Sequence, residues 1–169
     1  MRRAAFLDRD GTLIHDPGYL GDPQKVVILD GVPEAIVRLR RAGFLTVVVT
    51  NQSGVARGFY DESALHAVNQ RMTELLLAAH PEAQLDAIYY CLHATEDGCD
   101  CRKPKPGMFL RAQAELHLDM PASVAIGDAP RDCEAALLAG VGRAQQIGAS
   151  PLPPSLWAAT EQLVIGGAW

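Results

Sequence analysis

No apolar run in this 169-residue sequence approaches the roughly 20 residues that a membrane-spanning helix needs. The apolar stretch at residues 4–7 is also too short for the core of a secretory signal. Basic residues are not in excess either, since the formal net charge is -5 and no basic run could follow a nucleic-acid backbone. These absences predict a cytoplasmic protein that binds neither a membrane nor a nucleic acid. They are compatible with one locally positive pocket for a small anion.

Cysteine is also scarce, with four residues in the chain. Because thiols stay reduced in the cytoplasm, a cysteine cluster there indicates metal binding or catalysis rather than disulfides. Cys91, Cys99 and Cys101 lie close to His93 in the sequence, and three sulfurs with one imidazole suit a tetrahedral zinc ion. We therefore predict a zinc-binding loop, and the alternative is a set of reduced cysteines beside a surface histidine. Cys133 stands apart on a predicted helix, where we expect it to be a buried apolar residue.

Short apolar runs alternate along the chain with segments of helical periodicity. The expected strands are residues 4–7, 45–49, 87–90, 123–126 and 143–147. The expected helices are residues 33–41, a segment after Asp61 whose apolar face runs from Leu65 to Leu76, and residues 108–116 and 133–139. This alternation predicts a doubly wound α/β domain with a parallel sheet, and we expect residues 1–169 to form a single domain. The proline-rich tail after Ser150 receives no assignment.

Polar residues follow the expected strands at the point where each strand ends. They are Asp8 and Asp10, Thr50 and Asn51, Cys91 and His93, and Gly127 and Asp128. Ligands of such sheets bind at the carboxyl ends of the strands, so these side chains are expected to converge on one edge. Asp8 and Asp10, two residues apart, point the same way and would repel each other unless a divalent cation neutralised them. Taken alone, the pair is equally compatible with a solvated acidic turn or a helix N-cap.

Four segments together resemble the motifs of the haloacid dehalogenase superfamily, in the expected order and strand context. They are residues 6–13, 47–54, 102–104 and 125–128, with Asp132 just beyond the last. The resemblance implies that Asp8 attacks phosphorus and becomes an aspartyl-phosphate. Asp10 would protonate the leaving oxygen and then deprotonate the attacking water. Thr50 and Lys103 would bind the transferring phosphoryl oxygens.

The same resemblance implies a magnesium site. Mg²⁺ would be held by the carboxylates of Asp8 and Asp128 and the backbone carbonyl of Asp10, with Asp132 in support. Elementary chemistry agrees with this arrangement, because phosphoryl transfer depends mainly on positioning and on neutralising the phosphoryl oxygens. A divalent cation together with Lys103 suits a dianionic phosphate, and the cation also lets Asp8 stay ionised beside it.

The zinc-loop pattern, Cys-x-His followed by Cys-x-Cys-Arg-Lys-Pro, resembles one branch of this superfamily. That branch contains the D-glycero-D-manno-heptose 1,7-bisphosphate 7-phosphatases and the histidinol-phosphate phosphatases. Residues 16–19, 50–58 and 101–108 favour the heptose enzymes. The substrate-binding residues that this likeness implies are Asp16, Gly18, Tyr19, Asn51, Gln52, Ser53, Arg102 and Lys103. The leading hypothesis is removal of the C7 phosphate from heptose 1,7-bisphosphate, a precursor of cell-surface glycans such as lipopolysaccharide.

Two features depart from the heptose pattern. The zinc loop is short, like that of the histidinol-phosphate enzymes, and Ala129 stands where heptose enzymes commonly have a lysine, which Arg131 could replace. A histidinol-phosphate phosphatase, or another small phosphomonoesterase, is therefore the alternative enzyme. A non-catalytic zinc-bearing interaction domain is the alternative of another class, although it would need none of the motif residues. No insertion is long enough for a separate cap domain, so loops 14–30, 54–60 and 92–101 are expected to form the pocket of a monomeric enzyme.

Overall fold

Five parallel strands form the centre of the structure, a computed structural model that describes residues 1–149 and 153–165. They are β1 (Arg3–Leu7), β2 (Phe44–Asn51), β3 (Ala87–Cys91), β4 (Val124–Gly127) and β5 (Arg143–Gln146). Their order in the sheet is β3-β2-β1-β4-β5, so the chain winds outward from β1 in both directions. The predicted doubly wound parallel sheet is confirmed, and each expected strand is present within a few residues of its expected ends. That residues 1–169 form a single domain stays a prediction.

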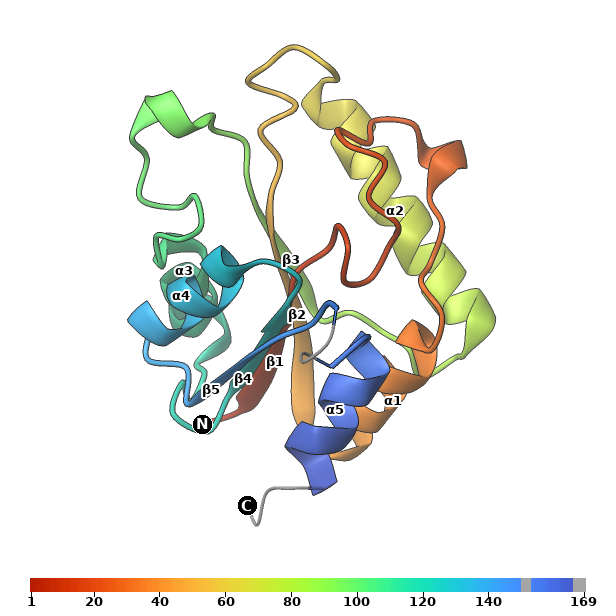
Figure 1. The fold of residues 1–169 in the computed structure, drawn as a ribbon, viewed down its shortest axis with the longest axis vertical. Helices are drawn as coiled ribbons and strands as arrows, with labels where there is room; N and C mark the ends of the chain where they lie inside the picture. Colours follow the sequence, from red (N-terminus) through yellow and green to blue (C-terminus); the bar gives the residue numbers. More distant parts are fainter. Residues whose placement is uncertain (150–152, 166–169) are drawn as a thin grey trace.

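Helices cover both faces of this sheet (Figure 1). They are α1 (Val32–Arg41), α2 (Glu62–Ala79), α3 (Gly107–Leu116), α4 (Pro130–Leu138) and α5 (Leu156–Ile165), with short 3-10 turns η1 (Pro23–Lys25) and η2 (Thr95–Asp97). The helices α3 and α4 lie on one face, and α1, α2 and α5 lie on the other. Crossover helices on both faces follow from parallel pairing, because consecutive parallel strands cannot be joined by a tight turn.

Successive side chains along a strand point to opposite faces of the sheet, so one strand contributes to the hydrophobic cores on both faces. In β1, Ala5 and Leu7 pack toward α1, α2 and α5, whereas Ala4 and Phe6 pack toward α3 and α4. Both cores are closed, since these four side chains are at most 1% exposed. Burying one large apolar side chain contributes about 1.5–3 kcal/mol, so the two cores together support a stable sheet.

Local signals account for several helix ends. The α2 helix begins after Asp61, whose Oδ1 accepts a hydrogen bond from the backbone N–H of Ala64 at 2.8 Å, as an N-cap does. The α1 helix ends before Gly43, whose φ of 87° suits glycine and few other residues. The α4 helix begins at Pro130, three residues before its predicted start, because proline is well placed in a first helical turn. Cys133 on this helix is partly exposed, so the expectation of full burial was wrong.

The loops that follow β1, β2 and β3 stand together at one end of the sheet, at the top of Figure 1. Among the described residues, the segments between strands hold only single helices, short 3-10 turns and loops, without a separate cap domain. No helix in the described part of the chain is long and apolar enough to span a membrane. The tail after Ser150, for which the sequence predicts no element, contains α5, while residues 150–152 and 166–169 fall outside the described residues.

Candidate active site

The carboxyl ends of β1, β2 and β4 bring their following residues to one pocket. Leu7 in β1 pairs with Val48 in β2 and with Ile126 in β4, and the N–H of Asp8 donates to the Ile126 carbonyl at 3.0 Å. A pocket of about 310 Å³ opens at this point. It is lined by Asp8, Asp10, Asp16, Gly18, Tyr19, Leu20, Thr50, Asn51, Gln52, Ser53, Gly54, Tyr60, Arg102, Lys103, Asp128 and Arg131.

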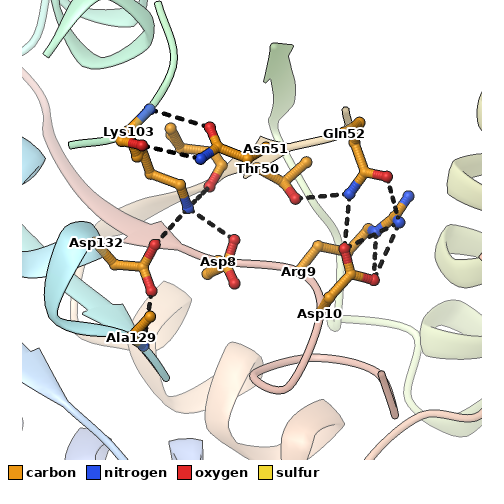
Figure 2. Close-up of polar contacts among 10 residues, drawn as sticks. Asp8, Arg9, Asp10, Thr50, Asn51, Gln52, Lys103, Ala129 and Asp132 are labelled. Carbon is orange, nitrogen blue, oxygen red and sulfur yellow. Dashed lines mark hydrogen bonds and ion pairs between the residues drawn. The ribbon is translucent and has the colours of Figure 1, made fainter. Parts of the chain in front are cut away.

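Lys103 is the buried cation of this pocket (Figure 2). Its Nζ lies 2.7 Å from Asp8 Oδ1 and 2.7 Å from Asp132 Oδ1, and it donates to the Val49 carbonyl at 2.7 Å. The side chain of Asn51 holds the Lys103 backbone through two hydrogen bonds. The ammonium group therefore has a defined place against Asp8, although β2 and the 103 region are far apart in sequence.

Asp8 and its neighbours form a compact acidic cluster. Burial raises the pKa of Asp8 to about 7; the Lys103 charge opposes this shift and the Asp132 charge adds to it. Burial, followed by the charge of Asp132, also raises the pKa of Asp128. One carboxylate oxygen from each of Asp8, Asp128 and Asp132 lies within 4.8 Å of the others. When all three carboxylates are ionised, the positive charge of Lys103 compensates one of their three negative charges, and two remain.

These residues fit a divalent cation such as Mg²⁺. Asp128 Oδ1 is buried without a hydrogen-bond partner among the described residues, and a buried unpaired carboxylate oxygen is costly unless a cation contacts it. Hard oxygen ligands are those that Mg²⁺ prefers. Gly11 makes room for Asp128, because a Cβ at Gly11 would lie 2.2 Å from Asp128 Oδ2 and its φ is 77°.

The carboxylate of Asp10 is held apart from this acidic cluster by Arg9 and Gln52 (Figure 2). Arg9 is fully buried, and its Nε and Nη2 donate to Asp10 at 3.0–3.1 Å. Gln52 Nε2 donates to Asp10 Oδ2 at 2.6 Å and to Thr50 Oγ1 at 2.9 Å. This region thus contains a second, separately organised carboxylate beside the one at Asp8.

A cysteine and histidine cluster lies at the end of β3 and on the loop that follows it. The sulfurs of Cys91, Cys99 and Cys101 are 3.1–3.6 Å apart, and His93 Nδ1 lies 3.3 Å from Cys101 Sγ. Zinc–sulfur bonds of about 2.3 Å in tetrahedral geometry would separate the sulfurs by roughly 3.8 Å, so the four groups need only a slight expansion. All four predicted ligands converge, and the donor set fits zinc.

The pocket loops also contact each other. The rings of Tyr19 and Phe59 have centroids 4.4 Å apart, although they come from loops 14–30 and 54–60. Tyr60 packs where Gly21 and Gly54 lack side chains, since a Cβ at either glycine would lie within 2.5 Å of Tyr60 atoms. These contacts join two of the three loops that were expected to form the pocket.

Comparisons with known proteins agree with this geometry. A family model described as haloacid dehalogenase-like hydrolase matches residues 16–140, well over half of the chain. The chain belongs to the haloacid dehalogenase-like hydrolases. The resemblance stated from the motifs is thereby confirmed, and so is the class of fold it implied.

Relatives of this hydrolase have one recurring name. The D-glycero-beta-D-manno-heptose-1,7-bisphosphate 7-phosphatase of Photorhabdus laumondii is 48% identical over 146 residues, covering 82% of this chain and 77% of the relative. The protein of the same name from Escherichia coli K12 is 44% identical over 146 residues, covering 82% and 75%. A solved D,D-heptose 1.7-bisphosphate phosphatase from B. bronchiseptica, complexed with magnesium and phosphate, is 34% identical with a TM-score of 0.86. That match covers 98% of this chain and 99% of that one.

Most site residues predicted for this hydrolase from its sequence lie in the one pocket, and the predicted zinc ligands lie at the end of β3 and on the adjoining loop. Asp132 is placed differently from a direct metal ligand: Oδ1 pairs with Lys103, and Oδ2 accepts from the N–H of Ala129 at 2.9 Å. Sequence reasoning assigned no role to Arg9 or Tyr60. For Arg9 the sequence offers one signal, because this arginine stands between two aspartates at the end of a strand. An arginine is seldom buried at such a position unless it is paired with a group of opposite charge.

Proposed function

We propose that this hydrolase is a Mg²⁺-dependent phosphatase that removes the C7 phosphate of D-glycero-D-manno-heptose 1,7-bisphosphate and releases the 1-phosphate. One observation supports it above the others. Asp8 lies against the buried ammonium of Lys103 and close to Asp128, whose Oδ1 has no hydrogen-bond partner among the described residues, in a pocket of about 310 Å³. That pocket belongs to a chain whose relatives are named for this reaction.

In the proposed mechanism, an oxygen of Asp8 attacks phosphorus while the bond from phosphorus to the C7 oxygen breaks. Asp10 gives its proton to that leaving oxygen, so the sugar departs as an alcohol. Asp10 then takes a proton from water, whose oxygen attacks the aspartyl-phosphate and releases inorganic phosphate and the Asp8 carboxylate. Thr50 and Lys103 bind the equatorial phosphoryl oxygens, where charge must be neutralised in the transition state.

Mg²⁺ would be held by the carboxylates of Asp8 and Asp128 and by the backbone carbonyl of Asp10. When bound, the cation neutralises phosphoryl oxygens and favours the ionised form of the buried carboxylates. Asp132 supports this site indirectly, because one of its oxygens pairs with Lys103 and the other accepts a hydrogen bond from the backbone at the start of α4. Zinc at Cys91, His93, Cys99 and Cys101 is proposed as structural, since four protein ligands leave no open position for water.

Substrate recognition is proposed to use both arginines that line the pocket, Arg102 and Arg131. The first follows a zinc ligand and donates from Nη1 to the His93 carbonyl at 3.2 Å, so the zinc loop restricts its position. The second offers a cation from α4, where Ala129 provides none. The exposed residues Asp16 and Tyr19 are proposed to contact the sugar from the facing loop.

One observation favours a different substrate. The short zinc loop, with five residues between His93 and Cys99, resembles histidinol-phosphate phosphatases more than many heptose enzymes. A histidinol-phosphate phosphatase or other small phosphomonoesterase is therefore the second candidate. A non-catalytic zinc-bearing domain would leave the convergence of Asp8, Asp10, Thr50 and Lys103 on a pocket unexplained.

The decisive experiment measures phosphate release with Mg²⁺ from both anomers of heptose 1,7-bisphosphate and from histidinol phosphate. We expect the highest kcat/KM on a heptose bisphosphate, with one phosphate released per molecule. A higher kcat/KM on histidinol phosphate would reverse the order of the two candidates. Absence of phosphate release from every ester would leave the non-catalytic domain. We further propose that the enzyme is a cytoplasmic monomer that binds neither membrane nor nucleic acid and supplies heptose for cell-surface glycans.

A further inference from the structure

Gln52 is buried, and protein groups occupy every hydrogen-bonding site of its side chain. Figure 2 shows its contacts with Arg9, Asp10 and Thr50. Nε2 donates to Asp10 Oδ2 at 2.6 Å and to Thr50 Oγ1 at 2.9 Å. Oε1 accepts from Arg9 Nη2 at 2.8 Å and from the Tyr60 hydroxyl at 2.7 Å. A carboxamide has two donor hydrogens and an oxygen with two lone pairs. Gln52 therefore has no site left for a hydrogen bond to a substrate, although it lines the pocket.

Arg9 contributes a charged contact to the same carboxylate. Nε donates to Asp10 Oδ1 at 3.1 Å, and Nη2 lies 3.0 Å from each Asp10 oxygen. Nη1 donates to Asn69 Oδ1 at 2.9 Å, which anchors the guanidinium on α2. Together with Gln52, these contacts supply two hydrogen bonds to each oxygen of Asp10.

The donors around Asp10 fix the orientation of its carboxylate. The guanidinium of Arg9 and the amide nitrogen of Gln52 act only as donors, so neither competes with Asp10 for a proton in the reaction. With two hydrogen bonds to each oxygen, the carboxylate has one defined orientation. Asp10 must exchange one of these hydrogen bonds in order to give or to take a proton, so the positions of its donors determine where that exchange occurs.

We propose that Gln52 and Arg9 are positioning residues that hold the Asp10 carboxylate in place for hydrolysis of the aspartyl-phosphate, and that Gln52 does not bind the substrate. This inference rests on the proposed function, in which Asp10 serves first as acid and then as base. It assigns Gln52 a different role from the substrate contact that its motif implied. Tyr60 belongs to the same group, because its hydroxyl holds Gln52 in the amide orientation that points Nε2 at Asp10.

The test separates formation of the aspartyl-phosphate from its hydrolysis. p-Nitrophenyl phosphate is the probe, because its leaving group departs as a stable phenolate and needs no acid. With this ester, kcat/KM reports formation of the phosphoenzyme, and kcat reports hydrolysis when that step is slower. Gln52→Glu has the same shape but places a second carboxylate against Asp10, so a hydrogen bond is replaced by repulsion between like charges. Gln52→Met removes the hydrogen bonds without adding a charge.

For Gln52→Glu we expect kcat to fall by about tenfold or more, within the usual range for a lost general base, while kcat/KM stays within about threefold. A burst of p-nitrophenolate and an acid-quenched phosphoenzyme should accompany this fall. Gln52→Met should change kcat in the same direction by a smaller factor. If either Gln52 variant does not fold, Tyr60→Phe removes one hydroxyl from the same group and should lower kcat while kcat/KM is retained.

Ser53→Ala is the matched comparison, because Ser53 is the next residue in the pocket wall and is proposed to contact substrate. It should lower kcat/KM without a burst. The same pattern in Gln52→Met would make Gln52 a substrate ligand and overturn the inference, as would unchanged kcat in Gln52→Glu. The wild-type protein is measured first with Mg²⁺. If it releases no phosphate, the proposed function fails and takes this inference with it; an active wild type with unaffected variants refutes the positioning role alone.

Discussion

The side chain of Asn51 makes two hydrogen bonds to the backbone of Lys103. Its Oδ1 accepts from the Lys103 N–H at 3.0 Å, and its Nδ2 donates to the Lys103 carbonyl at 3.1 Å. The two residues are 52 positions apart, so this contact joins the end of β2 to the loop after the cysteine and histidine cluster. It explains how a side chain from a distant loop reaches Asp8 with a defined geometry. Asn51, which was predicted to contact the substrate, thus also positions Lys103, the cation proposed to bind the phosphoryl group.

We expect Asn51→Ala to lower kcat by about tenfold or more, because Lys103 then has more freedom beside the phosphoryl group. Loss of two hydrogen bonds should also reduce the free energy of unfolding by about 1–3 kcal/mol. Urea unfolding and phosphate release together measure both effects. A variant with full kcat and an unchanged unfolding curve would contradict the role given to this contact.

Asp8→Asn should abolish steady-state turnover while the fold is retained, because an amide cannot replace the anionic nucleophile. Asp10→Asn is the matched comparison: it should still bind phosphate while losing acid and base catalysis. Circular dichroism and phosphate release check both variants. Appreciable turnover by purified Asp8→Asn, with wild-type contamination excluded, would refute the covalent mechanism.

Stability should depend on pH through Asp8. Burial raises its pKa to about 7 in the metal-free fold, against an ordinary value of 3.8. Between these values the folded state binds more protons than the unfolded state, so the contribution of Asp8 to stability is complete below about pH 4 and is lost as the pH rises through about 7. Mg²⁺ requires the ionised carboxylate, so the rise in Tm that it causes should be larger at about pH 8 than at about pH 5.5. Thermal unfolding with and without Mg²⁺ measures this; an equal rise at both pH values would argue against Asp8 as a ligand.

Cys99→Ser, or strong chelation, should raise KM and lower kcat, and added Mg²⁺ should not restore activity. Cys101 directly precedes Arg102 and Lys103, so a zinc ion on Cys101 would restrict two cations of the pocket. Of the four proposed ligands, only Cys91 is a buried member of a hydrophobic core, and Cys99 and Cys101 pack against its edge. Because the rest of both cores does not depend on the ion, the loop should lose its order without unfolding of the whole domain. Cys133→Ser is the control, because Cys133 lies outside the cluster. Zinc analysis and kinetics decide the matter: metal-free protein with unchanged kinetics would show that the loop needs no metal.

Ala129→Lys should raise KM for the bisphosphate, because Arg131 already places a cation in the pocket and like charges crowd there. Arg131→Ala should raise KM as well, and Arg131→Ala combined with Ala129→Lys should recover part of the loss. Steady-state kinetics on heptose 1,7-bisphosphate and on a monophosphate compare the four proteins. A lower KM in Ala129→Lys alone would mean that Arg131 does not take the place of the missing lysine.

Much of the site could be predicted because it follows from local sequence. Asp8 and Asp128 come directly after buried apolar strands, Thr50 lies near the end of another, and the carboxyl ends of parallel strands meet at one edge of a sheet. The zinc ligands are close in sequence, so their convergence needs only one short loop. The predicted N-cap at Asp61 likewise depends on residues within one helical turn.

Tertiary structure decided what depends on distant contacts. The α5 helix was not predicted from the sequence, because its burial depends on packing against α1. Its residues Leu156 and Leu163 complete the core there. No local pattern indicates that Arg9 is fully buried, since its position depends on Asn69 in α2 and Gln52 beyond β2. The motif placed Gln52 in the pocket, but only rotamers set by packing reveal which hydrogen-bonding sites remain free. Residue identity and spacing therefore determined the chemistry at the sheet edge, and long-range packing determined how each acid and cation is oriented.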